Sequence, residues 1–282
     1  MNVHFLTIMN KYILLLVIVA ISPGSLLKAD TNFNSPHSPQ YGSIDSAGNY
    51  VKLKDATFYY ETYGSGEPLL LLHGNGQSIN AFAKQIPELS KTYRVIAVDT
   101  RGQGRSTDES TEPLTYDKFA EDMKQLLDSL HISSTNILGW SDGGNTGLIM
   151  AIKYPSYVNK LAITGAVLAS TTDAVSGEIL EMIREERDKL NSTDQQSLKK
   201  KRLMTLLLNE PHIEVETLKQ IKAPTLVMAG EKDLIKEEHT RTIADHIPKS
   251  KLVIFKDATH FVPVEKVEEF NKTVIEFLDN GK

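Results

Sequence analysis

Short apolar runs alternate with segments of helical periodicity along most of the chain after residue 49. Runs such as PLLLL and RVIAVD are continuously apolar, as is typical of parallel strands that are buried on both faces. Apolar residues recur at helical spacing in residues 116–130, 236–247 and 264–278. The alternation predicts an α/β fold, a mostly parallel eight-stranded sheet with helices on both faces. We expect its strands at 50–54, 57–63, 68–72, 94–99, 135–139, 160–165, 224–229 and 251–255.

The pattern departs from this alternation at two places. The first two strands alternate in polarity and are joined tightly, which predicts an antiparallel hairpin. Between residues 169 and 215 only helical patterns occur, which predicts a small helical cap over the carboxyl ends of the strands, where open sheets bind ligands. A peripheral packing element is the alternative. Within this insertion, residues 199–202 read KKKR. This basic run is interpreted either as a solvated helix face or as a rim that steers anions.

The N-terminus has the pattern of a secretory signal peptide. Residues 1–29 contain a basic start, the apolar run YILLLVIVAI and a small-residue region that ends in a candidate cleavage site after Ala29. A membrane span takes about 20 apolar residues, so we expect cleavage and an exported protein, periplasmic or secreted if bacterial. An uncleaved membrane anchor is the alternative. Residues 30–48 are rich in Ser, Asn, Pro and Gly and read as a linker before one domain at 49–282.

Composition narrows the class of function. Hydrophobic residues make up 40% of the chain, which supplies ample material for a large core. The 36 acidic residues outnumber the 31 lysines and arginines, so no nucleic-acid partner is expected. The chain has no cysteine, which excludes disulfides, thiolate metal sites and a cysteine nucleophile.

Strand 135–139 runs directly into Gly-Trp-Ser-Asp-Gly-Gly and then into a helical segment. The pattern G-x-S-x-G at a strand-to-helix turn is typical of a nucleophile elbow, in which a serine holds a strained backbone conformation. Gly139 and Gly143 leave the space that the strand and the helix need to pack closely. Ser141 is therefore the candidate nucleophile.

A serine hydroxyl needs a base to take its proton and an acid to orient that base. His260 follows the last strand, and Glu231, Asp233 and Asp257 are the acidic residues near the ends of the last two strands. The order serine, acid, histidine is the one this architecture requires. His260 is the candidate base, and one of the three carboxylates orients it.

The developing oxyanion needs preorganised N–H donors. Strand 68–72 ends in the glycine-rich turn His-Gly-Asn-Gly, which brings the N–H of Asn75 toward the serine, and the N–H of Asp142 is the second candidate donor. Trp140 and Phe261, the neighbours of the nucleophile and of the base, are candidate substrate-binding residues together with Asp142.

From about residue 50 to 280 the chain resembles the α/β-hydrolases. The motifs HGNG, DTRGQGRS, GWSDGG, GEKD and ATH occur in the order of that family, and the stretches LGWSDGG and KYPSY are similar in particular to its biphenyl-hydrolase-like, valacyclovirase-type branch. The family spacing favours Asp233 as the acid and implies that Asp99 and Arg101 brace the sheet edge. His73 is expected to fix its own turn. Ala258 stands where the family often has a glycine before its histidine. The cap differs in sequence from the cap of that branch, so the resemblance does not define the substrate.

These observations predict a serine hydrolase that cleaves carboxylic esters of small molecules through an acyl-enzyme, without a metal or organic cofactor. A lactonase, an amidase or a cofactor-free perhydrolase would use the same triad, and a non-catalytic ligand-binding protein is the alternative of another class. The expected partner is a small-molecule ester. The sequence does not define an oligomeric state, and only the N-terminal segment suggests contact with a membrane.

Asp142 raises an electrostatic question. A carboxylate about 6 Å from the oxyanion would repel it by roughly 3 kcal/mol at an effective dielectric constant near 20, so a cation is expected to compensate it. One interpretation is that the side chain points away and pairs with a protein cation. The other is that a substrate ammonium pairs with it, as the resemblance implies for α-amino-acid esters.

Overall fold

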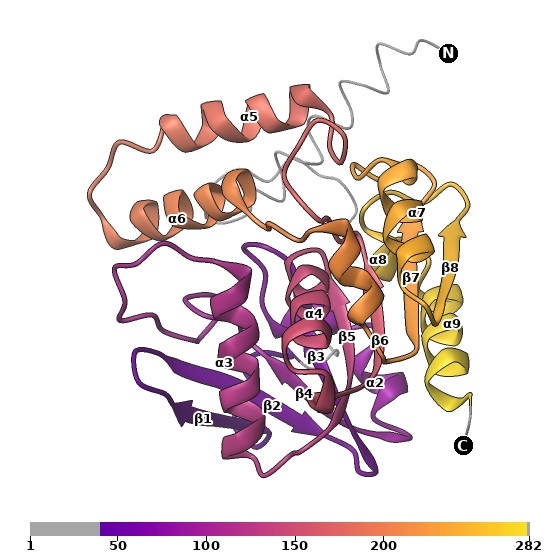
Figure 1. Cartoon of the computed structure of the whole chain (residues 1–282). Helices are drawn as coiled ribbons and strands as arrows, with labels where there is room; N and C mark the ends of the chain where they lie inside the picture. The colour runs from indigo at the N-terminus through magenta and orange to yellow at the C-terminus, as the bar shows by residue number, and fades with distance from the viewer. Residues whose placement is uncertain (1–39, 281–282) are drawn as a thin grey trace. The chain divides into compact units, whose positions relative to one another are not determined.

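The computed structural model describes residues 40–280, and eight strands form one sheet (Figure 1). The strands are β1 (Gly48–Lys52), β2 (Thr57–Tyr63), β3 (Glu67–Leu72), β4 (Tyr93–Val98), β5 (Thr135–Trp140), β6 (Val158–Thr164), β7 (Thr225–Gly230) and β8 (Ser250–Phe255). Their order across the sheet is β1-β2-β4-β3-β5-β6-β7-β8. β1 and β2 form the predicted antiparallel hairpin, β2 also runs antiparallel to β4, and all other neighbours are parallel. The predicted eight-stranded sheet is confirmed.

Both faces of the sheet are covered by helices, as predicted. Successive residues of β3 show this directly: Leu70 and Leu72 belong to one buried core, and Leu69 and Leu71 belong to the other. The first core contains apolar side chains of α3, α4 and α7, and the second contains those of α2 and α9. The helices are η1 (Ile79–Phe82), α2 (Ile86–Leu89), α3 (Tyr116–Ser129), α4 (Asp142–Lys153), η2 (Pro155–Tyr157), α5 (Gly177–Asp188), α6 (Gln195–Asn209), η3 (Val215–Gln220), α7 (Glu237–His246), α8 (Val262–Glu265) and α9 (Val267–Asp279).

The segment expected to form a cap contains α5 and α6, which lie beyond one end of the sheet in Figure 1. Ser176 and Asp194 cap these two helices, each accepting a hydrogen bond from a backbone N–H in the first turn. A β-bridge between Ala169 and His212 brings the two ends of the insertion together. The cap is therefore a helical pair inserted between β6 and β7.

The C-terminal helical pattern forms two helices instead of one. Lys266, with φ −124° and ψ 46°, leaves the helical conformation between α8 and α9. Glu265, the last residue of α8, accepts hydrogen bonds from the backbone N–H and the hydroxyl of Thr259 at 2.7 and 2.8 Å. The break thus lets a helix end hold the loop that carries His260.

The N-terminal boundary of the domain also differs from the expectation. Residues 40–47, part of the predicted linker, pack on β2 through the carboxylate of Glu61. That carboxylate accepts hydrogen bonds from the N–H groups of Gly42 and Ile44 and from the hydroxyls of Tyr59 and Tyr63. Four donors on one buried acid anchor this segment to β2, the second strand of the sheet.

The predicted signal segment and residues 30–39 lie outside the described residues. Among residues 40–280, no helix has the length and apolar character needed to cross a membrane.

Candidate active site

Ser141 lies at the junction of β5 and α4 with φ 55° and ψ −114°, a backbone conformation that residues other than glycine rarely adopt. The glycines two residues before and after it are required because a side chain at either position would clash with the backbone. A Cβ at Gly143 would lie 1.9 Å from the carbonyl oxygen of Leu72, and a Cβ at Gly139 would lie 2.3 Å from that of Gly143. This is the strained turn expected of a nucleophile elbow.

The candidate base His260 and the candidate acid Asp233 are in direct contact. The Nδ1 of His260 lies 2.7 Å from Oδ1 of Asp233, whose side chain is 1% exposed and which also accepts the N–H of Ile235 at 3.0 Å. Burial opposes protonation of the imidazole, but the charge and hydrogen bond of Asp233 outweigh it and raise the pKa of His260. Of the competing acids, Glu231 binds the N–H of Asp257, and Asp257 pairs with Lys232.

Two contacts link His260 to residues that adjoin Ser141. The indole N–H of Trp140 donates to the carbonyl oxygen of His260 at 3.0 Å. The backbone N–H of Ser141 donates to the carbonyl oxygen of Thr164 at 2.8 Å, and the next residue, Gly165, lies directly against the imidazole. A Cβ at Gly165 would approach Cε1 of His260 to 2.4 Å.

Gly165 is a residue of the site that no sequence motif marks. It has φ +65° at the carboxyl end of β6, and its position against His260 follows from strand order. A glycine that ends a buried strand is the only signal in the sequence.

The two candidate oxyanion donors have free N–H groups. Within residues 40–280, the backbone N–H groups of Asn75 and Asp142 donate to no protein acceptor, whereas those of Gly74 and Gly76 bind glutamine side chains. Asp142 is the first residue of α4, where a helix leaves N–H groups unpaired. A Cβ at Gly74 would lie 3.2 Å from that of Ser141, so the turn passes directly over the nucleophile.

The side chain of Asp142 is buried, and both of its oxygens accept hydrogen bonds. Its Oδ1 accepts the hydroxyl of Tyr116 at 2.6 Å, and its Oδ2 accepts the amide of Asn75 at 2.9 Å. Burial raises the pKa of the Asp142 carboxyl to about 6, although both hydrogen bonds oppose the rise. No lysine or arginine pairs with Asp142 among residues 40–280, and a protonated His260 is the cation that acts on it.

The two predicted aromatic contacts differ in exposure. Trp140 is only 2% exposed and packs edge-on against Phe261, with ring centroids 5.7 Å apart. Its burial and its hydrogen bond to His260 make it a support of the histidine loop rather than a surface for substrate. Phe261 is half-buried beside the imidazole, with centroids 6.1 Å apart, and remains the aromatic candidate for substrate contact.

The residues expected to brace the structure do so. Arg101 is 2% exposed and pairs with Asp55, Asp108 and Asp122 at 2.7–2.8 Å. His73 is buried, accepts the N–H of Thr100 at its Nε2, and has a pKa lowered to about 4 by burial. Its neutral imidazole fixes the turn before Asn75.

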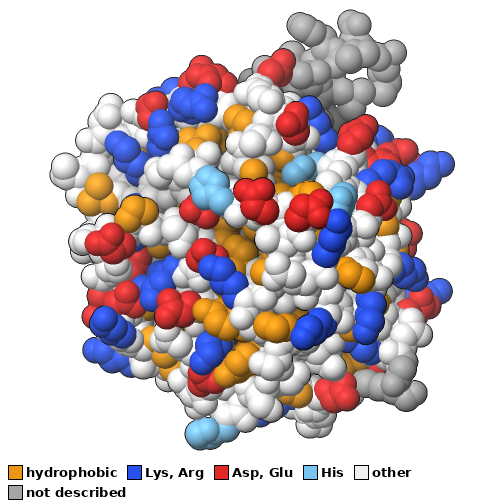
Figure 2. Space-filling model, in the orientation of Figure 1, with side chains coloured by type: hydrophobic (Ala, Val, Ile, Leu, Met, Phe, Trp, Pro, Cys, Tyr) orange, Lys and Arg blue, Asp and Glu red, His pale blue; other side chains and the backbone are white. Residues whose placement is uncertain are grey.

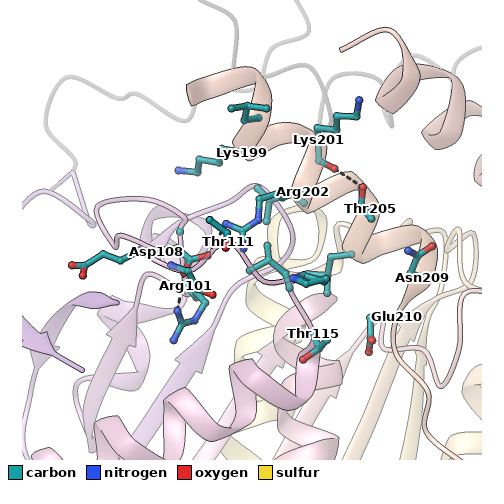
Figure 3. A pocket seen from close by; sticks show the side chains of 18 of the residues that line it. Arg101, Asp108, Thr111, Thr115, Lys199, Lys201, Arg202, Thr205, Asn209 and Glu210 are labelled. Atoms are coloured by element: carbon teal, nitrogen blue, oxygen red, sulfur yellow. Dashed lines mark hydrogen bonds and ion pairs between the residues drawn. The ribbon is translucent and has the colours of Figure 1, made fainter. Parts of the chain in front are cut away.

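A cavity of about 910 Å³ lies between α6 and the loop that precedes α3 (Figure 3). Lys199, Lys201 and Arg202 of the basic run line it, but Arg202 is already paired with Asp108 at 2.7 Å, and Lys201 points away from it in Figure 3. The basic run is thus divided between an internal ion pair and solvent-facing lysines. No cluster of metal ligands occurs among the residues that the structure describes.

Comparison with known proteins agrees with this geometry. Residues 67–207 match the alpha/beta hydrolase fold family. The chain belongs to this family. The mouse (Mus musculus) protein "Serine hydrolase BPHL" is 30% identical over 256 residues, which cover 81% of this hydrolase and 85% of that protein. The 2-hydroxymuconate semialdehyde hydrolase of Pseudomonas sp. (strain CF600) is 26% identical, with coverage of 87% and 96%.

A solved structure shows the same fold as this hydrolase. The enol-lactonase from Burkholderia xenovorans LB400 superposes with a TM-score of 0.68 at 22% identity, covering 82% of this hydrolase and 99% of that chain. The relatives carry names from several hydrolytic reactions, so membership of the family assigns a hydrolase without assigning the bond that it cleaves.

Proposed function

We propose that the protein hydrolyses carboxylic esters of small molecules through an acyl-enzyme on Ser141. The observation that carries the proposal is the 2.7 Å contact between His260 and Asp233 beside a serine in a strained elbow. His260 takes the proton of the Ser141 hydroxyl as the oxygen attacks the ester carbonyl, and then gives it to the departing alcohol. Water repeats the attack on the acyl-enzyme with the same base and releases the acid.

Two features support this reaction. Asp233 holds the Nδ1–H of His260, which leaves Nε2 free to accept a proton, and stabilises the imidazolium that forms. The free N–H groups of Asn75 and Asp142 are placed to receive the negative charge of the tetrahedral intermediate. A lactonase, an amidase or a perhydrolase would use the same residues, so the substrate must be tested directly.

The test is a panel of p-nitrophenyl esters, lactones and amides offered to residues 30–282 and to the Ser141→Ala variant. We expect turnover of esters by the wild type and none above background by the variant, with unchanged melting temperatures because a small half-exposed side chain contributes little to packing. Turnover of lactones or amides alone would overturn the ester assignment. Equal activity of the two proteins would overturn the serine mechanism.

α-Amino-acid esters are the substrate class that we propose more specifically. Their support is the carboxylate of Asp142, which is buried next to Ser141 in sequence and pairs with no lysine or arginine among the described residues. A substrate ammonium would compensate this charge. The relative named serine hydrolase BPHL belongs to the branch that the elbow motif resembles.

Asp142→Asn tests this preference. We expect kcat/KM for an aminoacyl ester to fall about 10-fold or more relative to the matched ester without the amine, since a charged hydrogen bond contributes about 1.5–3 kcal/mol. Equal losses on both substrates would assign Asp142 a structural role and remove the amine from the proposal.

A further inference from the structure

The two residues that carry the free N–H groups are joined by their side chains. The amide of Asn75, in the turn after β3, donates to Oδ2 of Asp142, the first residue of α4, at 2.9 Å. We call this contact the Asn75–Asp142 bridge. It links segments 67 residues apart in sequence at the point where the oxyanion is expected.

The bridge fixes the position of Asn75 relative to α4. Asn75 lies between Gly74 and Gly76, whose backbone N–H groups bind glutamine side chains. The backbone N–H of Asn75 itself has no protein acceptor among residues 40–280, so its side chain is what ties this residue to the rest of the site. Asp142, in contrast, begins a helix that is buried along its length. A hydrogen bond from the turn to this helix fixes the distance between the two N–H groups, and a misplacement of about 1 Å costs an enzyme as much as about 100-fold in rate.

Tyr116 completes the arrangement from a third element. It is 1% exposed on α3, and its hydroxyl donates to the other oxygen of Asp142 at 2.6 Å. The carboxylate is therefore held from two sides, and it cannot rotate without leaving a buried donor unpaired.

The bridge also reaches the cap. The same amide of Asn75 donates to the carbonyl oxygen of Leu203 on α6 at 3.2 Å. The cap helix thus contributes to the orientation of the turn that carries the oxyanion donor.

We propose that Tyr116 and the side chain of Asn75 are positioning residues that act through Asp142 to hold the two N–H groups in one oxyanion hole. The inference rests on the proposed serine mechanism. It assigns these side chains a role in the transition state, where the oxyanion forms, and none in the affinity for a neutral substrate.

The first experiment compares Tyr116→Phe with Tyr157→Phe. The hydroxyl of Tyr157 donates to Asp128 on the surface, so the second variant removes an equivalent hydroxyl away from the site. We measure the rate of labelling by a fluorophosphonate, and kcat and KM for p-nitrophenyl acetate, a neutral ester without an amine. Tyr116→Phe should lower the labelling rate and kcat about 10-fold with KM nearly unchanged, and Tyr157→Phe should match the wild type.

The second experiment exchanges the partners of the bridge. Asn75→Asp places two carboxylates together and should lower the labelling rate about 100-fold. The double variant Asn75→Asp/Asp142→Asn restores one donor and one acceptor and keeps an oxygen for Tyr116. It should recover about 10-fold of the loss, with the remainder due to the missing bond to Leu203.

The outcomes separate this inference from the proposed function. Labelling requires only an activated Ser141, so a wild type that labels but hydrolyses no ester overturns the ester proposal and still tests the bridge. A double variant no faster than Asn75→Asp, or a Tyr116→Phe variant equal to the wild type, overturns the bridge. Absence of labelling in the wild type overturns both.

Discussion

Gly165 leaves the room in which the imidazole of His260 lies. A Cβ there would approach Cε1 of His260 to 2.4 Å, so Gly165→Ala must displace the base. We expect kcat to fall roughly 100-fold, the scale of a misplacement of about 1 Å. Gly102→Ala is a matched control, because Gly102 also has φ +65° and a Cβ there would make only an ordinary 3.4 Å contact with Asp108. Equal activity losses in the two variants would attribute the effect to backbone strain instead.

The pair of His260 and Asp233 makes a prediction about pH. The raised pKa of His260 keeps the imidazole protonated to a higher pH, and a protonated imidazole cannot accept the proton of Ser141. Activity should therefore fall as the pH drops through a value above 6.5, the ordinary histidine pKa. This fall is the acid limb of the pH profile, and Asp233→Asn should move it to lower pH. The same variant should reduce kcat by as much as about 10⁴-fold, the loss that this change causes in the triad of a serine protease.

The control for this pH profile is Glu231→Gln, which removes a neighbouring acid whose carboxylate accepts the N–H of Asp257 instead of a proton of the imidazole. Its acid limb should stay where it is in the wild type. An unchanged profile for Asp233→Asn together with a shifted one for Glu231→Gln would show that another carboxylate orients the base.

Residue positions in the candidate site were predictable where short sequence motifs mark them. The elbow glycines, Asp233 and His260 follow strands in the required order, and each lies where that order predicts. Trp140 was expected at the substrate, and the sequence did not reveal that it is buried with its indole N–H bound to the carbonyl oxygen of the distant His260. Tyr116 had no motif at all, since its role depends on which helix packs beside α4.

Among the elements, the loop after β4 is held by the buried cation Arg101. Arg101 pairs with Asp122, whose side chain is 1% exposed and otherwise lies 3.8 Å from Lys118, and with Asp108, which also pairs with Arg202. Removal of one partner from such a network leaves uncompensated buried charge and costs about 3–5 kcal/mol. Arg101→Leu should lower the free energy of unfolding by this amount in urea titrations.

The matched control is Arg241→Leu, which breaks an exposed pair with Glu237 inside α7. Exposed pairs contribute about 0–1 kcal/mol, so its free energy of unfolding should change little. A loss at Arg101 no larger than the loss at Arg241 would mean that water reaches the buried acids and that the network does not brace this loop.

The strands were predictable because burial on both faces makes them continuously apolar, and every expected strand is present within two residues at each end. The break at Lys266 was not predictable, since apolar periodicity continues across it. The contact at the break, between Glu265 and the N–H of Thr259, joins the helix end to a preceding loop and has no pattern in the sequence. Residues 40–47 looked like a linker because their composition is polar. Their attachment depends on Glu61, which the local sequence does not reveal.

For the molecule as a whole, charge gives little guidance to a partner. The chain has a formal net charge of −5, and on the face shown in Figure 2 acidic and basic side chains are interspersed. Such a surface favours solubility over attraction to nucleic acid. The small-molecule partner that we propose is consistent with this distribution.

Export is the prediction that concerns the full chain. From the signal pattern in residues 1–29 we propose that the mature protein begins near Asp30 outside the cytoplasm. N-terminal sequencing of protein recovered from the extracytoplasmic fraction should return Asp30 or a near neighbour. Recovery of Met1 in the membrane fraction would indicate an uncleaved anchor.

The most direct test of the central claim is intact-mass and peptide analysis of the protein trapped with a slowly deacylating p-nitrophenyl ester. The serine mechanism predicts the addition of one acyl group per chain, located on Ser141, formed in a burst with release of one equivalent of p-nitrophenol. Ester turnover without any acyl adduct, or an adduct on another residue, would contradict it.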